Sequence, residues 1–183
     1  MSIQFTIESY FILLPLFLIF LVTLFGTSKF KTRKFTGLQY ILLISFGIYI
    51  SAVIHLVFFP IDVNIGPYAN LTPWYKTINF IPLLTLDIKT FVLNILMLVP
   101  LGIYLPLLNP KYGIVMKAAK LALAVSLTFE VLQLIIRITL GNGRSTDIND
   151  LLANTLGGAF GFLIYKMLMR SPAIRRLADR FKL

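Results

Sequence analysis

Five long apolar stretches constrain the fold of this chain more than any other feature of its sequence. Each has about 17 to 25 residues, the length that an α-helix rising about 1.5 Å per residue needs to cross a hydrocarbon core of about 30 Å. With 58% hydrophobic residues, the chain of 183 residues has more apolar side chains than a soluble domain of its size buries. We therefore predict an all-α, polytopic membrane helix bundle that forms a single transmembrane domain over residues 1–183, with about five transmembrane helices. These helices are expected near residues 8–26, 38–59, 91–107, 115–138 and 148–169.

The basic residues are distributed unevenly between the two sides of such a bundle. Of the 17 Lys and Arg residues, 13 lie between the first two helices, between the third and fourth helices, or at the C-terminal end. The positive-inside rule places these segments in the cytoplasm, so we expect the N-terminus outside and a cytoplasmic C-terminus. This distribution explains the net charge of +10 without a nucleic-acid partner. The 13 residues are Lys29, Lys31, Arg33, Lys34, Lys111, Lys117, Lys120, Lys166, Arg170, Arg175, Arg176, Arg180 and Lys182.

Two segments outside the apolar stretches carry signals of their own. The connection 60–90 contains four prolines, which break any continuous helix, and its apolar part 79–84 is too short to cross a bilayer. We expect an external loop that lies at the outer leaflet or dips into it. The tail 171–183 has apolar residues at helical spacing and basic residues on the other faces, which predicts an amphipathic helix on the cytoplasmic leaflet. A helix that packs on another protein is the alternative.

The fourth apolar stretch carries a stripe of polar residues. Ser126, Glu130, Gln133 and Arg137 follow one another at intervals of four, three and four residues, so they lie within about 60° of one another on a helix. An ionisable side chain near the centre of a membrane helix costs about 2.5–3.5 kcal/mol, so it requires either a structural partner or a functional reason. Glu130 lies about 8 residues, or roughly 12 Å, before the expected end of the helix, which places it near mid-bilayer.

The fifth stretch begins with a matching polar stripe. Asp147, Asp150 and Asn154 again fall within about 60° of one another. The short glycine-rich loop before them predicts that helices four and five are antiparallel neighbours, so that the two stripes can face each other. Gly157 and Gly161 continue the same face at the spacing that allows membrane helices to approach closely.

Several of these polar residues also have purely structural explanations. The aspartates at the start of the fifth helix, Asp147 above all, suit an N-cap and the helix dipole. Arg137 or Arg144 can neutralise Glu130 in a structural ion network. His55, the one histidine, lies among aliphatic residues, where a histidine is more often a satisfied interface residue than a base or a ligand.

Four short motifs occur in a fixed order over about 80 residues with apolar spacers between them. They are Asn79-Phe80-Ile81-Pro82-Leu83, Asn94 to Gly102, Phe129 to Gln133, and Arg144 to Asp150 followed by Asn154 to Gly158. In these motifs the chain resembles the VanZ-like membrane family, whose namesake is associated with resistance to teicoplanin-type glycopeptide antibiotics. Asn149 stands where the family pattern often has an aspartate. The resemblance implies a multi-pass protein of the bacterial cytoplasmic membrane with a role in the cell envelope, and it names no reaction.

Two functions of different classes fit these observations. The first is a non-catalytic factor that contributes to teicoplanin-type resistance by binding an amphiphile in an outer-leaflet polar pocket between helices three, four and five. The amphiphile would be a lipid-linked wall precursor or the acylated lipoglycopeptide antibiotic, and membrane lipids are expected partners. This reading needs no cofactor. Its binding residues would be Asn79, Asn94, Gln133, Arg137, Arg144 and Asn154, which can meet a polar headgroup.

The second function is a membrane enzyme that acts on a lipid-linked phosphate or wall precursor. Glu130, Asp147 and Asp150 would be its catalytic residues, either as acid and base or as ligands of Mg²⁺. The chain has no cysteine, no glycine-rich phosphate loop, no histidine pair and no serine triad. A transporter fits less well because the polar residues gather at one end of the bundle. The sequence alone leaves a metal site and enzymatic activity open.

Overall fold

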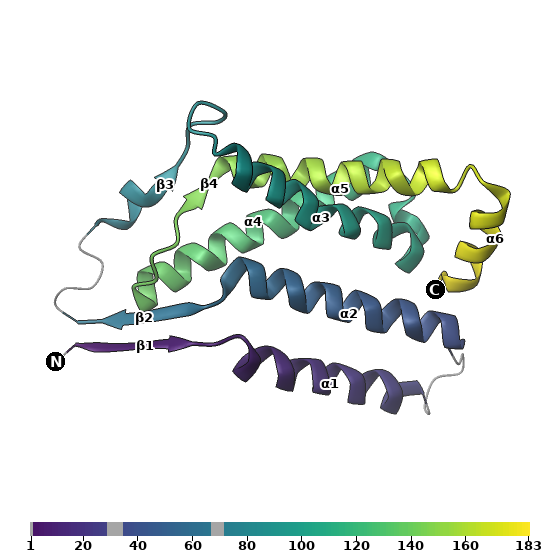
Figure 1. Cartoon of the computed structure of the whole chain (residues 1–183), viewed down its shortest axis with the longest axis horizontal. Coiled ribbons are helices and arrows are strands. Elements are labelled where there is room, and N and C mark those ends of the chain that lie inside the picture. The colour runs from purple at the N-terminus through teal and green to yellow at the C-terminus, as the bar shows by residue number, and fades with distance from the viewer. Residues whose placement is uncertain (1, 29–34, 67–71) are drawn as a thin grey trace.

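The computed structural model describes residues 2–28, 35–66 and 72–183, and helices dominate this part of the chain (Figure 1). The helices are α1 (Tyr10–Ser28), α2 (Gly37–Phe58), α3 (Ile88–Leu108), α4 (Val115–Leu140), α5 (Ile148–Leu168) and α6 (Pro172–Phe181). The strands are β1 (Ile3–Ile7), β2 (Ile61–Ile65), β3 (Ile78–Asn79) and β4 (Thr146–Asp147), and the 3-10 helices are η1 (Trp74–Thr77) and η2 (Pro110–Tyr112).

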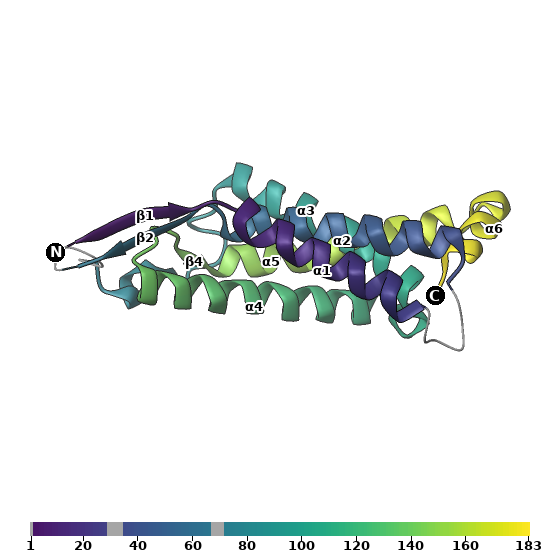
Figure 2. The ribbon, with the colours of Figure 1, turned by 90° about the horizontal axis from the view of Figure 1, so that it is seen from below.

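The first five helices run back and forth along a common direction (Figures 1 and 2). Among the described residues, α2, α3, α4 and α5 are each long and apolar enough to cross a membrane. The prediction of an all-α membrane helix bundle is therefore confirmed. α1 lies beside α2 and is apolar over the shorter stretch Tyr10–Gly26, so it remains the predicted fifth span.

The chain order gathers the helix ends into two groups. One end, here called the strand end, holds β1 to β4 together with Arg137 and Arg144 (Figure 1). The opposite end, here called the α6 end, holds α6, the connection from α3 to α4 with Lys111, and the start of α4 with Lys117. The basic residues of the first connection, at 29–34, lie outside the described residues. The assignment of the strand end to the outside and of the α6 end to the cytoplasm remains a prediction from the charge distribution.

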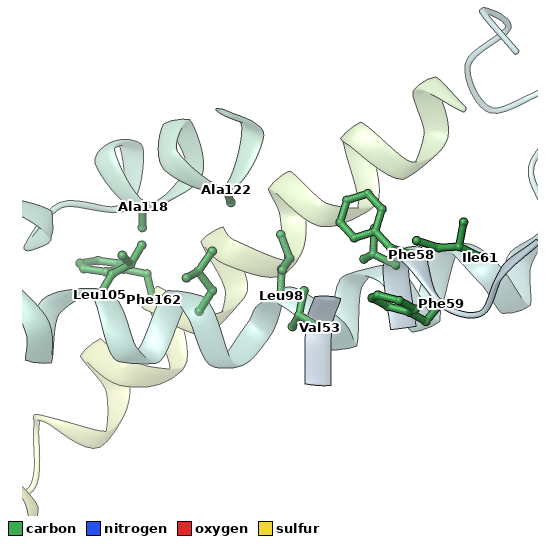
Figure 3. Close-up of a cluster of buried hydrophobic side chains, with 11 residues drawn as sticks. Val53, Phe58, Phe59, Ile61, Leu98, Leu105, Ala118, Ala122 and Phe162 are labelled. Carbon is green, nitrogen blue, oxygen red and sulfur yellow. The ribbon is translucent and has the colours of Figure 1, made fainter. Parts of the chain in front are cut away.

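The core lies between α2, α3, α4 and α5 and consists mostly of aliphatic and small side chains (Figure 3). Leu98 of α3 is 1% exposed, and Ala118 and Ala122 of α4 are fully buried. Phe58 and Phe59 extend this core toward the strand end. Many other large apolar side chains are exposed on the outer surface of the bundle, as expected for helices that lipid surrounds.

Glycines bring α3 and α5 into backbone contact. A Cβ atom added to Gly157 would overlap the carbonyl oxygen of Ile95, and one added to Gly161 would overlap that of Val99. Gly102 of α3 meets the backbone of α5 in the same way. The small-residue face of α5 therefore packs on α3, its parallel neighbour, which identifies the helix that the glycine spacing allows to approach closely. We call this contact, formed by Gly102, Gly157 and Gly161, the glycine interface.

Two strands that the sequence analysis did not anticipate extend the strand end beyond the helices (Figures 1 and 2). β1 pairs antiparallel with β2, with Ile7 opposite Ile61. Ile61 and Val63 are buried while Asp62 between them is exposed, an alternation of period two that is typical of a strand. The Thr6 hydroxyl also donates a hydrogen bond to the Asp62 carboxylate at 2.9 Å.

The expected external loop 60–90 contains β2, η1 and β3, and its described part holds no helix of membrane-spanning length. β3 pairs in parallel with β4, which places Asn79 next to Asp147. Beyond β3, the apolar side chains of Phe80, Leu83 and Leu84 are exposed. Their exposure suits a segment that dips into the outer leaflet, and that location stays a prediction.

The amphipathic tail forms α6, which turns back at the end of α5 (Figure 1). The Gln39 side chain of α2 donates to the Lys182 carbonyl at 2.6 Å, and the Leu183 N–H donates to the Leu107 carbonyl at 3.1 Å. The Lys182 ammonium lies 2.7 Å from Asp179 and, by donating a hydrogen bond, lowers the pKa of that carboxyl below its usual value. The helix thus packs on its own bundle, and its contact with the cytoplasmic leaflet remains a prediction.

The glycine interface provides a test of the packing of α3 on α5. Gly161→Ala should lower the thermal unfolding temperature of the purified protein in detergent, because overpacking costs typically about 1–3 kcal/mol. Gly26→Ala in α1 is the matched control, since an added Cβ there meets no atom within 4 Å and alanine favours a helix. Equal unfolding temperatures for the two variants would contradict the close contact of α3 and α5.

Candidate functional site

A groove of about 530 Å³ lies in the strand-end half of the bundle, among α2, α3, α4 and the start of α5. The sequence predicts three of these walls, and the structure adds the C-terminal end of α2 as the fourth. The polar lining residues are Thr90, Asn94, Glu130, Gln133, Arg144, Asp150 and Asn154, and the apolar ones are Leu56, Val57, Leu93, Leu96, Met97 and Phe129.

Glu130 of α4 lies inside the bundle and does not face lipid. Its side chain is 4% exposed, and one carboxylate oxygen accepts the backbone N–H of Asp147 at 3.0 Å. An unpaired N–H at such a place would cost about 1–3 kcal/mol, so the carboxylate stabilises the junction between α4 and β4. This part of the polar stripe of α4 is therefore directed at the start of α5, as the sequence predicts.

Asp147 and Asn79 fasten the external loop to the start of α5. Asp147 is the N-cap of α5 and accepts the Asn149 N–H at 2.8 Å, which bears out the structural explanation for this residue. Asn79 donates to the other Asp147 oxygen at 3.0 Å and to the Thr85 hydroxyl at 2.6 Å. Asn149 in turn accepts the Leu83 N–H at 2.8 Å. Asp147 and Asn79 bond to each other and to the external loop, and neither side chain lines the groove.

Deeper in the groove, polar side chains connect α3, α4 and α5. Asn94 of α3 donates to the Asp150 carboxylate at 2.5 Å, and Asn154 donates to the Ser126 hydroxyl of α4 at 2.9 Å. Because each bond joins two helices in a region of low dielectric constant, the bonds fix the relative positions of the three helices.

The long polar side chains of α4 and of the following loop bind backbone carbonyls. Gln133 donates to the Val57 carbonyl at 2.9 Å and joins α4 to α2. Arg144 donates to carbonyls at the end of α2, that of Phe59 at 2.8 Å. Arg137 donates to the Arg144 carbonyl at 2.8 Å and is absent from the groove lining.

A direct ion pair between Glu130 and an arginine does not form. In the part of the chain that the structure describes, the one ion pair joins Lys182 to Asp179 at the α6 end. The explanation that Arg137 or Arg144 neutralises Glu130 by direct pairing is therefore wrong, since both guanidinium groups bind carbonyls instead.

The groove retains hydrogen-bond acceptors that have no donor. Asn154 Oδ1 is buried without a partner among the described residues. Glu130 and Asp150 each have one carboxylate oxygen bonded, and within the described chain no hydrogen bond is found to the other oxygen. A ligand that carries N–H or O–H groups can donate hydrogen bonds to these acceptors.

A metal site is not evident from the side chains at this end. Within residues 2–28, 35–66 and 72–183, no group of three or more His, Cys, Asp or Glu side chains is arranged so that it could hold a metal ion. His55 is exposed on α2 and lies outside the groove lining.

Comparison with known proteins places these features in a family. The family model VanZ/LLP1 matches residues 46–170, which is more than half of the chain. The chain belongs to the VanZ/LLP1 family. It is also 32% identical over 126 residues to Protein VanZ of Enterococcus faecium, an alignment that covers 65% of this chain and 70% of that protein. No solved structure matches the chain. The resemblance predicted from the four motifs is confirmed.

The region matched by the VanZ/LLP1 model contains the complete groove. It includes α3, α4 and α5 and the second half of α2, and it leaves out α1 and α6. The groove is therefore part of the family region, whereas α1 and α6 lie outside the matched range.

The structure brings together six of the nine residues that the sequence singles out. The sequence predicts an aliphatic wall for the groove but does not name its residues. On α3 the spacing of Thr90, Leu93, Asn94 and Met97 is that of one helical face and could have indicated them. Asp147, Asn79 and Arg137 lie next to the groove without lining it. The six that line it are Asn94, Glu130, Gln133, Arg144, Asp150 and Asn154.

The Glu130 carboxylate provides a test of the site geometry. Glu130→Gln retains an oxygen that can accept the Asp147 N–H, whereas Glu130→Leu leaves that N–H unpaired. We expect the Leu variant to be less stable than the Gln variant by about 1–3 kcal/mol, measured as thermal unfolding in detergent. A Leu variant as stable as the wild type would show that this bond does not hold α4 to β4.

Proposed function

We propose that this protein contributes to glycopeptide resistance at the bacterial cytoplasmic membrane by binding an amphiphile in the groove. The amphiphile is an acylated glycopeptide or a lipid-linked wall precursor. The observation that carries the proposal is a single groove with unpaired acceptors on one part of its lining and apolar side chains on the other.

The apolar wall suits an acyl chain. Leu93 and Leu96 of α3 are 54% and 59% exposed, and Met97 and Phe129 continue the wall inward. A groove of about 530 Å³ lies within the range of about 300–1,000 Å³ that is usual for small-molecule sites. An amphiphile with one apolar tail could therefore enter from the leaflet and keep its tail in an apolar environment.

The polar part of the lining suits a headgroup rich in donors. Asn154 Oδ1 has no partner in the described chain, and Glu130 and Asp150 add carboxylate oxygens. The peptide N–H groups and sugar hydroxyls of a glycopeptide are such donors, as are those of a peptide-bearing wall precursor. The guanidinium group of Arg144 already donates hydrogen bonds to the carbonyls of Leu56 and Phe59. It therefore has fewer N–H groups available for an anionic headgroup than the sequence alone suggests.

The alternative function is an enzyme that acts on a lipid-linked phosphate or wall precursor, with or without Mg²⁺. Glu130 and Asp150 favour it because both acidic residues line the groove. Asp147 supports it less, since its two carboxylate oxygens accept the Asn149 N–H and the Asn79 amide. Release of a product from a defined lipid-linked substrate by the purified protein would establish the alternative.

Antibiotic susceptibility tests the binding proposal. Expression should raise the inhibitory concentration of acylated glycopeptides more than that of unacylated ones, because only the former offer a tail to the apolar wall. Glu130→Gln combined with Asp150→Asn should remove this difference, while Asp62→Asn on β2, an equally conservative change outside the groove, should preserve it. Equal protection against both drug types would contradict binding of the drug itself, and protection that survives the double substitution would contradict the proposal for either ligand.

Retention by the purified protein separates the two candidate amphiphiles. If the drug itself is the ligand, immobilised protein should retain the acylated glycopeptide. If a wall precursor is the ligand, the drug should pass through and the lipid extract of the purified protein should contain the precursor.

A further inference from the structure

A second groove, of about 490 Å³, lies at the α6 end between the start of α4, the end of α5 and α6. Its apolar lining includes Val115 of α4 together with Phe162 and Leu163 of α5. Three basic side chains line it as well, Lys166 from α5 and Arg175 and Lys182 from α6. The groove therefore combines an apolar surface along α5 with cations at the level where the helices end.

The basic character of this groove is not balanced by carboxylate side chains. Of the seven acidic residues in the sequence, only Asp179 follows residue 150, and it pairs with Lys182 at 2.7 Å. Lys166 and Arg175 have no carboxylate partner among the described residues. An anionic group placed in the groove would therefore meet two cations, Lys166 and Arg175, whose charged groups make no direct ion pair within the described chain.

The position of α6 makes this arrangement a built site. The Lys182 carbonyl accepts the Gln39 side chain at 2.6 Å, and the Leu183 N–H donates to the Leu107 carbonyl at 3.1 Å. These bonds fix the C-terminal end of α6 on α2 and α3, so Lys182 is held at the groove. A free amphipathic helix would spread its cations over the membrane surface instead.

We propose that this groove binds an anionic glycerophospholipid, with its phosphate among Lys166, Arg175 and Lys182 and an acyl chain along Phe162 and Leu163. The apolar surface below the cations distinguishes a lipid from free phosphate. The three cations favour an anionic lipid over a zwitterionic one, because the ammonium group of a zwitterionic headgroup is repelled by them. This site is separate from the groove at the strand end and does not depend on the function proposed there.

Native mass spectrometry of the full-length protein in detergent tests this proposal. With phosphatidylglycerol and phosphatidylcholine supplied at equal concentration, the wild type should retain several-fold more phosphatidylglycerol. Lys166→Gln with Arg175→Gln should weaken phosphatidylglycerol binding by an order of magnitude or more, since each cation contributes about fivefold near a lipid surface. Arg176→Gln with Arg180→Gln, the same charge change on α6 outside the groove, should leave the binding within about twofold of wild type, because neither side chain touches the lipid.

Four results would overturn the proposal. Equal retention of the two lipids by the wild type would show no selectivity for an anionic headgroup, and unchanged binding after Lys166→Gln with Arg175→Gln would show that these cations do not hold it. An equal loss of phosphatidylglycerol binding in both double variants would show that binding depends only on the net charge of the protein and not on this groove. Displacement of phosphatidylglycerol by inorganic phosphate at the same concentration would identify a site for free phosphate. Thermal unfolding of each variant excludes loss of fold as the cause.

Discussion

The backbone contact between α3 and α5 at the glycine interface sets the geometry of the whole bundle. Gly157 and Gly161 lie against backbone carbonyls of α3, so the two helices approach more closely than any side chain at these positions would allow. This approach brings Asn94 of α3 within hydrogen-bonding distance of Asp150 of α5. α4 then covers the pair, with Ala122 packed against Gly158.

The polar contacts at the strand end follow from this packing and prepare the groove. Glu130 reaches the Asp147 N–H and Asn154 reaches Ser126, so each of these bonds joins α4 to the start of α5. Such bonds are strong in a low-dielectric interior, so they hold the side chains that line the groove in fixed positions. The oxygen atoms of these side chains that have no partner therefore remain available to a ligand. The two ends of the bundle differ in chemistry. Two carboxylates and several amides line the groove at the strand end together with Arg144, whereas three basic side chains line the groove at the α6 end.

The sequence predicts the helices and much of the site because hydropathy and helical spacing act locally. The stripes of α4 and α5 follow from residue intervals, and the short loop between them predicts that they face each other. The sequence does not reveal the contribution of α2, because that helix is apolar on all sides and no face of it is marked. It also could not show that Arg144 binds carbonyls of α2, a contact between residues 85 or more positions apart. The strand β2 was predictable from its alternation, whereas its pairing with β1 is a long-range contact.

The central claim is that an amphiphile occupies the groove at the strand end, and photolabelling tests it most directly. An alkyl amine with a diazirine on its chain provides both the tail and the N–H donors that the lining suits. We predict labelling of Leu96, Met97 and Phe129 that Glu130→Gln with Asp150→Asn removes. Labelling spread evenly over lipid-facing residues such as Leu123 and Ile135, and unchanged by the double substitution, would contradict the account.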